Sequence, residues 1–135
     1  MAVIRDDMRP IRSGADVVAV RQVVREFAIQ AGFSLVEQTK IVTAASELAR
    51  NTVIYGGGGE MRVERLYQGP KRTGLRLVFE DQGPGIADIE LALRDGYTTG
   101  SGLGLGLNGA RKLSHEFDIQ SKPGAGTRVT ITRWK

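Results

Sequence analysis

The feature of this sequence that most restricts its fold is a cluster of glycines in the second half of the chain. Glycine makes up 18 of the 135 residues, and eight of the 18 lie between Gly83 and Gly109. In segment 98–107, TTGSGLGLGL, every second residue from Gly100 to Gly106 is glycine, and a helix is predicted to follow near residues 105–115. Backbone N–H groups at the start of a helix point towards an anion. The pattern therefore predicts a phosphate-binding loop, with a merely flexible connection as the alternative.

Three well-known phosphate-binding loops do not fit this segment. A Walker A loop would need Gly-Lys-Ser/Thr, which does not follow. Gly104, Gly106 and Gly109 match the dinucleotide fingerprint by spacing, but segment 94–100, RDGYTTG, is not the strand that must precede it. The loop of the eukaryotic-type protein kinases would need His-Arg-Asp and Asp-Phe-Gly downstream, and neither occurs.

A second group of polar residues lies earlier, in the helical segment Glu47-Leu-Ala-Arg-Asn51. Glu47 and Asn51 are four residues apart, so they share a helix face, offset from the apolar stripe. A carboxylate beside a carboxamide suits a hard cation, or a general base near a metal-bound phosphate. A solvated helix face is the alternative interpretation.

A third group, Glu80-Asp-Gln-Gly-Pro-Gly-Ile86, follows a predicted strand. Gly83 and Gly85 on either side of a proline predict a tight turn that lets the backbone approach a ligand closely. Asp81 can accept hydrogen bonds from an exocyclic amine there. An ordinary Asp-Gly turn that closes the strand is the alternative.

The remaining patterns predict one domain over residues 1–135, since this length is usual for a single domain. Apolar spacing and end signals predict a helix that begins after Ser13, capped with Asp16, and ends at Gly32, and a second helix that begins with a capping box at Ser34 and Glu37. The second helix carries an apolar stripe of Ile41, Ala45, Leu48, Thr52 and Tyr55. Strands are expected at 2–11 (an edge strand), 60–68, 74–80, 117–121 and 127–133, with a short helix at 87–94 and another at 105–115. The order β-α-α-β-β-α-α-β-β predicts an α/β two-layer sandwich, a mixed sheet with its helices on one face.

Composition excludes several classes of function. The chain has no cysteine, so it has no disulfide and no thiolate metal site. No apolar run approaches the roughly 20 residues of a membrane span, and the N-terminus is unlike a secretion signal, so a cytoplasmic protein without a membrane partner is expected. The net charge of +4 comes from interspersed signs and the aromatic content is 6%, so no nucleic-acid partner is expected.

Taken together and in this order, the three groups resemble the Bergerat-fold (GHKL) ATPases, which include gyrase, the Hsp90 chaperones, histidine kinases and the MutL proteins. Glu47 and Asn51 match the N box of that superfamily, Asp81-x-Gly83-x-Gly85 the first glycine box, and Gly102-x-Gly104-x-Gly106 the second. Gly126-Thr127 matches its late Gly-Thr pair. The resemblance covers nearly the whole chain. Within the superfamily, the motifs and the ending Arg133-Trp134 are most similar to the anti-sigma-factor serine/threonine kinases and the RsbT-like stressosome switch kinases.

The resemblance implies a role for each matching residue. Asn51 would hold Mg²⁺ against the phosphates of ATP, and Glu47 would accept the proton of the attacking serine. Asp81 would bind the adenine amine, with Gly85 and Thr127 shaping that pocket. The glycines of the boxes complete the cofactor-binding set, with a mobile lid around the phosphates formed by Gly102, Gly104 and Gly106. Arg94 and Arg111 are candidates for a contact with the γ-phosphate.

The function implied is an ATP-dependent serine/threonine kinase of a partner-switching stress or sigma-factor pathway. Its substrate would be a STAS-domain antagonist or scaffold protein, with a sigma factor or a downstream phosphatase as the other partner. The alternative is an anti-sigma factor that acts mainly as an ATP-controlled binding module. A fragment of a histidine kinase fits less well, because no phosphoacceptor helix is found. His115 is expected to lie outside the site, and Trp134 to serve packing or an interface.

Overall fold

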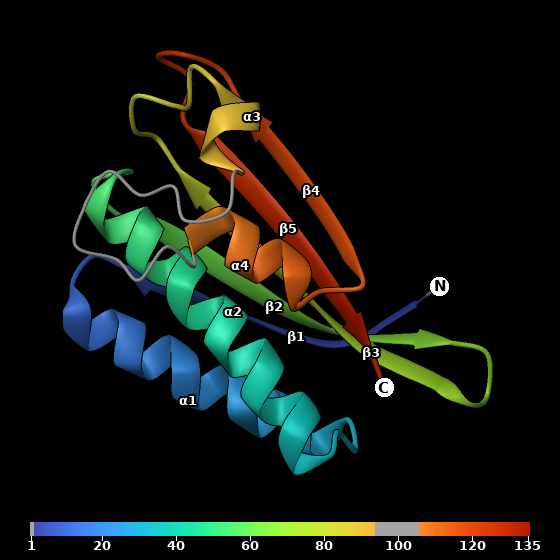
Figure 1. Cartoon of the computed structure of the whole chain (residues 1–135). Helices are drawn as coiled ribbons and strands as arrows, with labels where there is room; N and C mark the ends of the chain where they lie inside the picture. Colours follow the sequence, from blue (N-terminus) through green and yellow to red (C-terminus); the bar gives the residue numbers. More distant parts are fainter. Residues whose placement is uncertain (1, 94–105) are drawn as a thin grey trace.

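The computed structural model describes residues 2–93 and 106–135, which form one five-stranded sheet with helices on one side (Figure 1). The predicted order of elements is confirmed, with ends that shift by a few residues. The elements are β1 (Ala2–Ile11), α1 (Gly14–Gln30), α2 (Leu35–Ile54), β2 (Gly59–Gln68), β3 (Arg72–Asp81), α3 (Ile89–Ala92), α4 (Gly106–Lys112), β4 (Glu116–Ser121) and β5 (Thr127–Trp134).

The strands lie in the order β1-β2-β3-β5-β4, with β1 at an edge as predicted. The α/β two-layer fold is confirmed, but the four pairings between these strands are all antiparallel, whereas a mixed sheet was expected. The reason is the position of β5. β4 runs parallel to β3 after the helical crossover, and β5 returns between the two strands, so that it pairs antiparallel with both.

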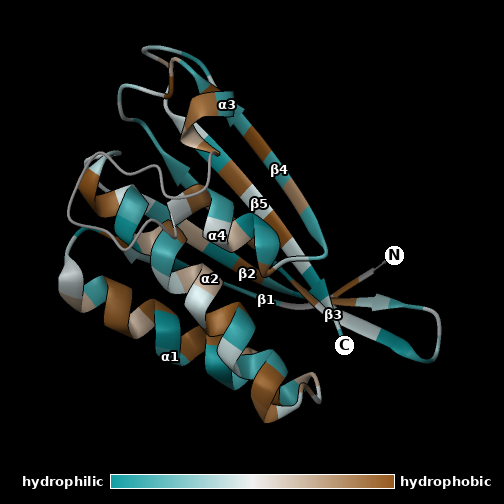
Figure 2. Ribbon diagram, in the orientation of Figure 1, coloured by the Kyte–Doolittle hydropathy of each residue, from teal (hydrophilic) through white to brown (hydrophobic). Residues whose placement is uncertain are grey.

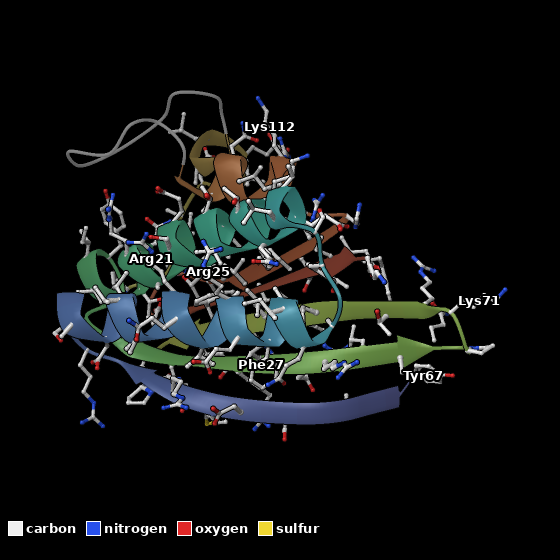
Figure 3. All side chains as sticks on the ribbon, turned by 90° about the horizontal axis from the view of Figure 1, so that it is seen from below. Arg21, Arg25, Phe27, Tyr67, Lys71 and Lys112 are labelled. Atoms are coloured by element: carbon white, nitrogen blue, oxygen red, sulfur yellow. The ribbon has the colours of Figure 1, made fainter. Side chains whose placement is uncertain are left out.

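The core lies between the sheet and the two long helices. Figure 2 shows apolar and polar residues alternating along α1 and α2, and Figure 3 shows Phe27 on the side of α1 that faces the strands. Buried residues alternate along β3, where Leu75, Leu77 and Phe79 point to the helices, as expected for a half-buried strand. The next residue of that series is Asp81, so the pleat turns its side chain to the helix side as well. None of the helices in the described residues is long and apolar enough to cross a bilayer.

The capping box that opens α2 is present in both of its hydrogen bonds. The Glu37 N–H donates to Ser34 Oγ over 3.1 Å, and the Ser34 N–H donates to Glu37 Oε1 over 2.9 Å. The Ser34 N–H holds the pKa of the Glu37 carboxyl below its usual value. At α1 the N-cap is Ser13, as predicted, but its side chain makes no capping bond; Asp16 instead accepts from the Arg12 N–H.

Two further expectations can be compared with the structure. Four members of the α2 stripe are buried, but Tyr55 is 41% exposed, because α2 ends at Ile54 and the chain continues into four consecutive glycines, residues 56–59. Trp134 serves packing: its indole N–H donates to Glu116 Oε2 over 2.6 Å, and the Arg72 guanidinium lies 4.0 Å from its ring centre. His115 also contacts Trp134, because its Nδ1 accepts a hydrogen bond from the Trp134 backbone N–H.

Candidate functional site

A cavity of about 460 Å³ lies where the C-terminal part of α2 faces the ends of β3 and β5. Its volume is typical of small-molecule sites, which are mostly apolar with a few placed polar groups. The apolar part of the lining includes Leu48, Phe79, Ile86, Leu91, Leu107 and Val129, and the polar part includes Asn51, Thr52, Asp81, Asp88 and Thr127. The cavity therefore brings together residues from all three groups singled out in the sequence.

The N box residues lie on α2, one turn apart. Both Glu47 and Asn51 are half-buried, which fits their position beside the buried Leu48 and Thr52. Asn51 lines the cavity, and Glu47 is not among the lining residues. Neither side chain makes a hydrogen bond or an ion pair with another residue of the described ranges, so the Asn51 carboxamide can accept or donate a bond to a ligand. The solvated-face alternative does not hold for Asn51, which faces the cavity.

Asp81 ends β3 and does two things at once. Its Oδ1 accepts from the Gly83 N–H over 2.9 Å, which is the Asp-Gly turn that the sequence also allowed. Its Oδ2 lies against Gly56, which follows α2, and a Cβ added to Gly56 would overlap the carboxylate. Both interpretations of Asp81 are compatible with the structure, because one oxygen closes the turn while the side chain still lines the cavity.

The loop after Asp81 is fastened to the β4–β5 turn by several contacts. The Gly124 N–H donates to the Pro84 carbonyl over 2.7 Å, and the Ile86 N–H donates to Ser121 Oγ over 2.8 Å. Gly85 has φ +78°, and a Cβ there would overlap the Lys122 carbonyl, so the close approach requires glycine. The close approach that the sequence predicted at Gly85 is thus made, in the structure, to the protein's own backbone.

Thr127 begins β5 and reaches the cavity from the opposite strand. It pairs with Asp81 across the β3–β5 ladder, so the two side chains lie next to each other on the helix side of the sheet. Its Oγ1 is 2.8 Å from Ser121 Oγ. The late Gly-Thr pair and the first glycine box are therefore neighbours in space, although more than 40 residues separate them in the chain.

The second glycine box reaches the cavity through its last residue. Gly106 is the first residue of α4 and lines the cavity, whereas Gly102, Gly104 and Arg94 lie outside the described residues. Arg111 is exposed on α4, donates to Asn108 Oδ1 over 2.6 Å, and is not among the lining residues.

A second hollow, of about 530 Å³, lies on the opposite face of the sheet. Three ion pairs run along this open face, Arg62–Asp6, Arg76–Glu64 and Arg128–Glu80, and at least one partner of each pair lines the hollow. Among the charged residues that line this hollow, all but Glu60 belong to these ion pairs, so most of its charges are already neutralised. The cavity at the end of α2 is the better candidate.

The residues of this cavity fit an adenine nucleotide. Its apolar lining suits a flat base, and Asp81 and Thr127 place acceptor oxygens beside each other. No group of three or more His, Cys, Asp or Glu side chains that could hold a metal occurs in the described ranges. Asn51 offers one amide oxygen to the cavity, and a Mg²⁺ ion in a phosphate site takes further oxygen ligands from the substrate phosphates and from water.

Sequence reasoning missed two residues that build the site. Gly56 belongs to none of the sequence motifs, and its contact with Asp81 depends on how α2 packs against β3. Ser121 had no motif to mark it, yet its hydroxyl contacts both the loop after Asp81 and Thr127. Its position at the end of a predicted strand, beside a Pro-Gly turn, was the only available signal.

Comparison with known proteins identifies the family to which the chain belongs. Residues 36–135 match the family described as "Histidine kinase-, DNA gyrase B-, and HSP90-like ATPase". The chain is 44% identical over 119 residues to the serine/threonine-protein kinase RsbT of Bacillus subtilis (strain 168), an alignment that covers 88% of this chain and 89% of the relative. It is 30% identical over 117 residues to the anti-sigma F factor of Thermoanaerobacter sp. (strain X514), covering 84% and 82% of the two chains.

Solved structures show the same fold at lower identity. The structure of the RsbU and RsbW domains from Mycobacterium tuberculosis aligns with a TM-score of 0.63 and 21% identity over 96% of this chain and 32% of that one. The SiaB-SiaC complex from Pseudomonas aeruginosa aligns with a TM-score of 0.52 and 15% identity over 98% and 91%.

Proposed function

Because the chain belongs to the family of histidine kinase-, DNA gyrase B- and HSP90-like ATPases, we propose that it is an ATP-dependent protein serine/threonine kinase of a partner-switching pathway. The observation that carries this proposal is the convergence of Asn51, Asp81 and Thr127 on one cavity, in a chain similar over most of its length to a serine/threonine kinase. Residues 1–135 act as one domain in this proposal.

In the proposed site, the base lies between the apolar side chains, with its exocyclic amine donating to Asp81. Gly83 and Gly85 shape the loop beside it, and Thr127 completes the pocket from β5. Gly102, Gly104 and Gly106 are the proposed phosphate-binding residues. Asn51 would hold Mg²⁺ here, and the ion would supply charge neutralisation for the transfer.

Glu47 is the proposed general base. The hydroxyl oxygen of the substrate serine or threonine forms a bond to the γ-phosphorus, the bond to the bridging oxygen of ADP breaks, and the hydroxyl proton passes to the Glu47 carboxylate. A carboxylate in this place is free for that task, because it has no hydrogen bond or ion pair with another described residue. Catalysis in such a site comes mainly from positioning and charge stabilisation.

The proposed substrate is a STAS-domain antagonist or scaffold protein, and the other partner is a sigma factor or a downstream phosphatase. Phosphorylation brings up to about two negative charges to the interface that faces the ATP phosphates. Repulsion between like charges then releases the modified partner. The cytoplasmic location expected from the sequence stays a prediction.

The second candidate function is an anti-sigma factor that acts mainly by binding, and the 30% identity to an anti-sigma F factor favours it. Incubation with radiolabelled ATP, Mg²⁺ and STAS proteins encoded nearby separates the two. We expect label on the STAS protein with the wild type, and a large loss with Glu47→Ala. Glu26→Ala is the matched control, since Glu26 is an exposed glutamate on α1. Partner binding without transfer of label by the wild type would favour the binding module instead.

A further inference from the structure

Ser121 lies behind the candidate site and makes three contacts with one hydroxyl group. Its Oγ is 2.8 Å from the Ile86 N–H nitrogen, 3.0 Å from the Gly126 carbonyl oxygen and 2.8 Å from Thr127 Oγ1. Thr127 lines the cavity, and Ser121 does not. No motif assigns a role to this serine.

The protons available in this cluster fix the direction of each bond. A hydroxyl has one proton and two lone pairs, an N–H can only donate, and a carbonyl can only accept. Ser121 Oγ therefore accepts from Ile86 and gives its own proton to the Gly126 carbonyl. Its remaining contact, with Thr127, must then use the Thr127 proton.

The opposite direction of the bond between Ser121 and Thr127 leaves the Gly126 carbonyl without its hydrogen-bond donor. If the Ser121 proton went to Thr127, the carbonyl of Gly126, a buried residue, would lose this hydrogen bond, and an unsatisfied buried acceptor costs free energy. The first arrangement satisfies all three neighbours. It points the Thr127 proton towards Ser121, so Thr127 Oγ1 has only lone pairs to offer to the cavity.

We propose that Ser121 is a positioning residue that sets base specificity, by holding the Thr127 hydroxyl as an acceptor beside the Asp81 carboxylate. Two neighbouring acceptors select a ligand edge that donates, such as the exocyclic amine of adenine, directly or through one water. This inference rests on the proposed function, in which the cavity takes the base of ATP. It adds a residue outside the cavity to the set that decides which base is bound.

The test compares ATP with purine riboside triphosphate, which lacks the 6-amine and keeps the ring nitrogens. The dissociation constant of purine riboside triphosphate divided by that of ATP, both measured by calorimetry, reports how much the 6-amine contributes to binding. Ser121→Ala frees the Thr127 proton to turn to the cavity, so we expect this ratio to fall about tenfold, the size of one hydrogen bond. Ser121→Thr keeps a hydroxyl on the same carbon and should restore the ratio.

Two matched variants separate this role from a structural one. Ser114→Ala removes a serine whose hydroxyl donates only to the Ala110 carbonyl, and the ratio should stay at the wild-type value. Thr127→Val should lower the ratio as Ser121→Ala does, and the double variant should lower it no further. If Ser121→Ala does not fold, Ser121→Cys, with its weaker donor and acceptor, provides the same comparison.

The outcomes decide between the inference and the proposed function. A Ser121 variant that weakens both nucleotides equally, leaving the ratio unchanged, overturns the inference while ATP binding by the wild type supports the proposed function. A wild type that binds neither nucleotide overturns both.

Discussion

Replacing Asp81 with asparagine gives a sharp test of the candidate site, because the structure separates the two tasks of this side chain. The turn needs only an acceptor at Oδ1 for the Gly83 N–H, and the carboxamide oxygen of asparagine provides one. The second oxygen, Oδ2, becomes an NH₂ group. Asp81→Asn therefore keeps the turn and changes only what the side chain offers to a ligand.

The magnitude follows from the bond that is lost. A hydrogen bond to a charged group contributes about 1.5–3 kcal/mol, which corresponds to roughly a 10-fold to 150-fold change in the dissociation constant. An NH₂ group that faces the adenine amine also places two donors against each other. We expect ATP to bind about 100-fold more weakly, and the preference for ATP over GTP to fall, because the new NH₂ group can donate to the guanine carbonyl oxygen.

Calorimetry with ATP and Mg²⁺ measures the effect, and thermal unfolding shows that the fold is kept. Asp118→Asn is the matched control: Asp118 is an exposed aspartate on β4 that accepts from Gln120, and ATP binding should not change. Unchanged ATP affinity in a folded Asp81→Asn protein would refute the reasoning and leave Asp81 as a turn residue only.

Three other substitutions test separate parts of the molecule. Glu47→Ala should keep nucleotide and partner binding and slow transfer of label to the partner by about 10²–10⁴-fold, whereas Asn51→Ala should also lose Mg²⁺-dependent ATP binding; filter binding and the transfer assay distinguish them. Gly85→Ala should lower the melting temperature and weaken ATP binding, because the new Cβ overlaps the Lys122 carbonyl at a positive φ, and an unchanged melting temperature would contradict the packing described here. Ser34→Ala removes one bond of the capping box and should reduce the free energy of unfolding by about 1 kcal/mol in a denaturant titration, with ATP binding unaffected.

The parts of the fold that the sequence predicts well are those set by local chemistry. The capping box at Ser34 and the alternation along β3 depend on residues within a few positions of each other, and both are confirmed. The expectation of a mixed sheet was wrong, because the return of β5 between β3 and β4 leaves no local signal. Tyr55 was misplaced for a related reason: an apolar spacing does not say where the last turn of a helix leaves the core.

In the candidate site, too, residues marked by local motifs could be predicted, and residues that act through distant contacts could not. Asp81, Gly85 and Asn51 could be selected because their types and spacing form motifs, although their roles stay predictions. Gly56 and Ser121 could not, because Gly56 acts through Asp81 and Ser121 through Ile86, and both partners are distant in the chain. Their importance depends on the strand order, which places the β4–β5 turn beside the loop that follows β3.

The two ends of the site should therefore respond differently to mutation. Where the base is proposed to bind, Asp81 and Ser121 each hold backbone groups of the protein, so substitutions that remove these hydrogen bonds should alter base selectivity and stability together. The side chains of Glu47 and Asn51 make no hydrogen bond with another described residue, and substitutions that break no buried hydrogen bond are usually the less destabilising ones. Substitutions on α2 can thus alter phosphate chemistry with little loss of stability. A change of base specificity instead requires changes in two loops that pack against each other. This arrangement requires a loss of activity without a loss of stability at Glu47 and Asn51, and a coupled loss where the Asp81 acceptor itself is removed, as in Asp81→Ala.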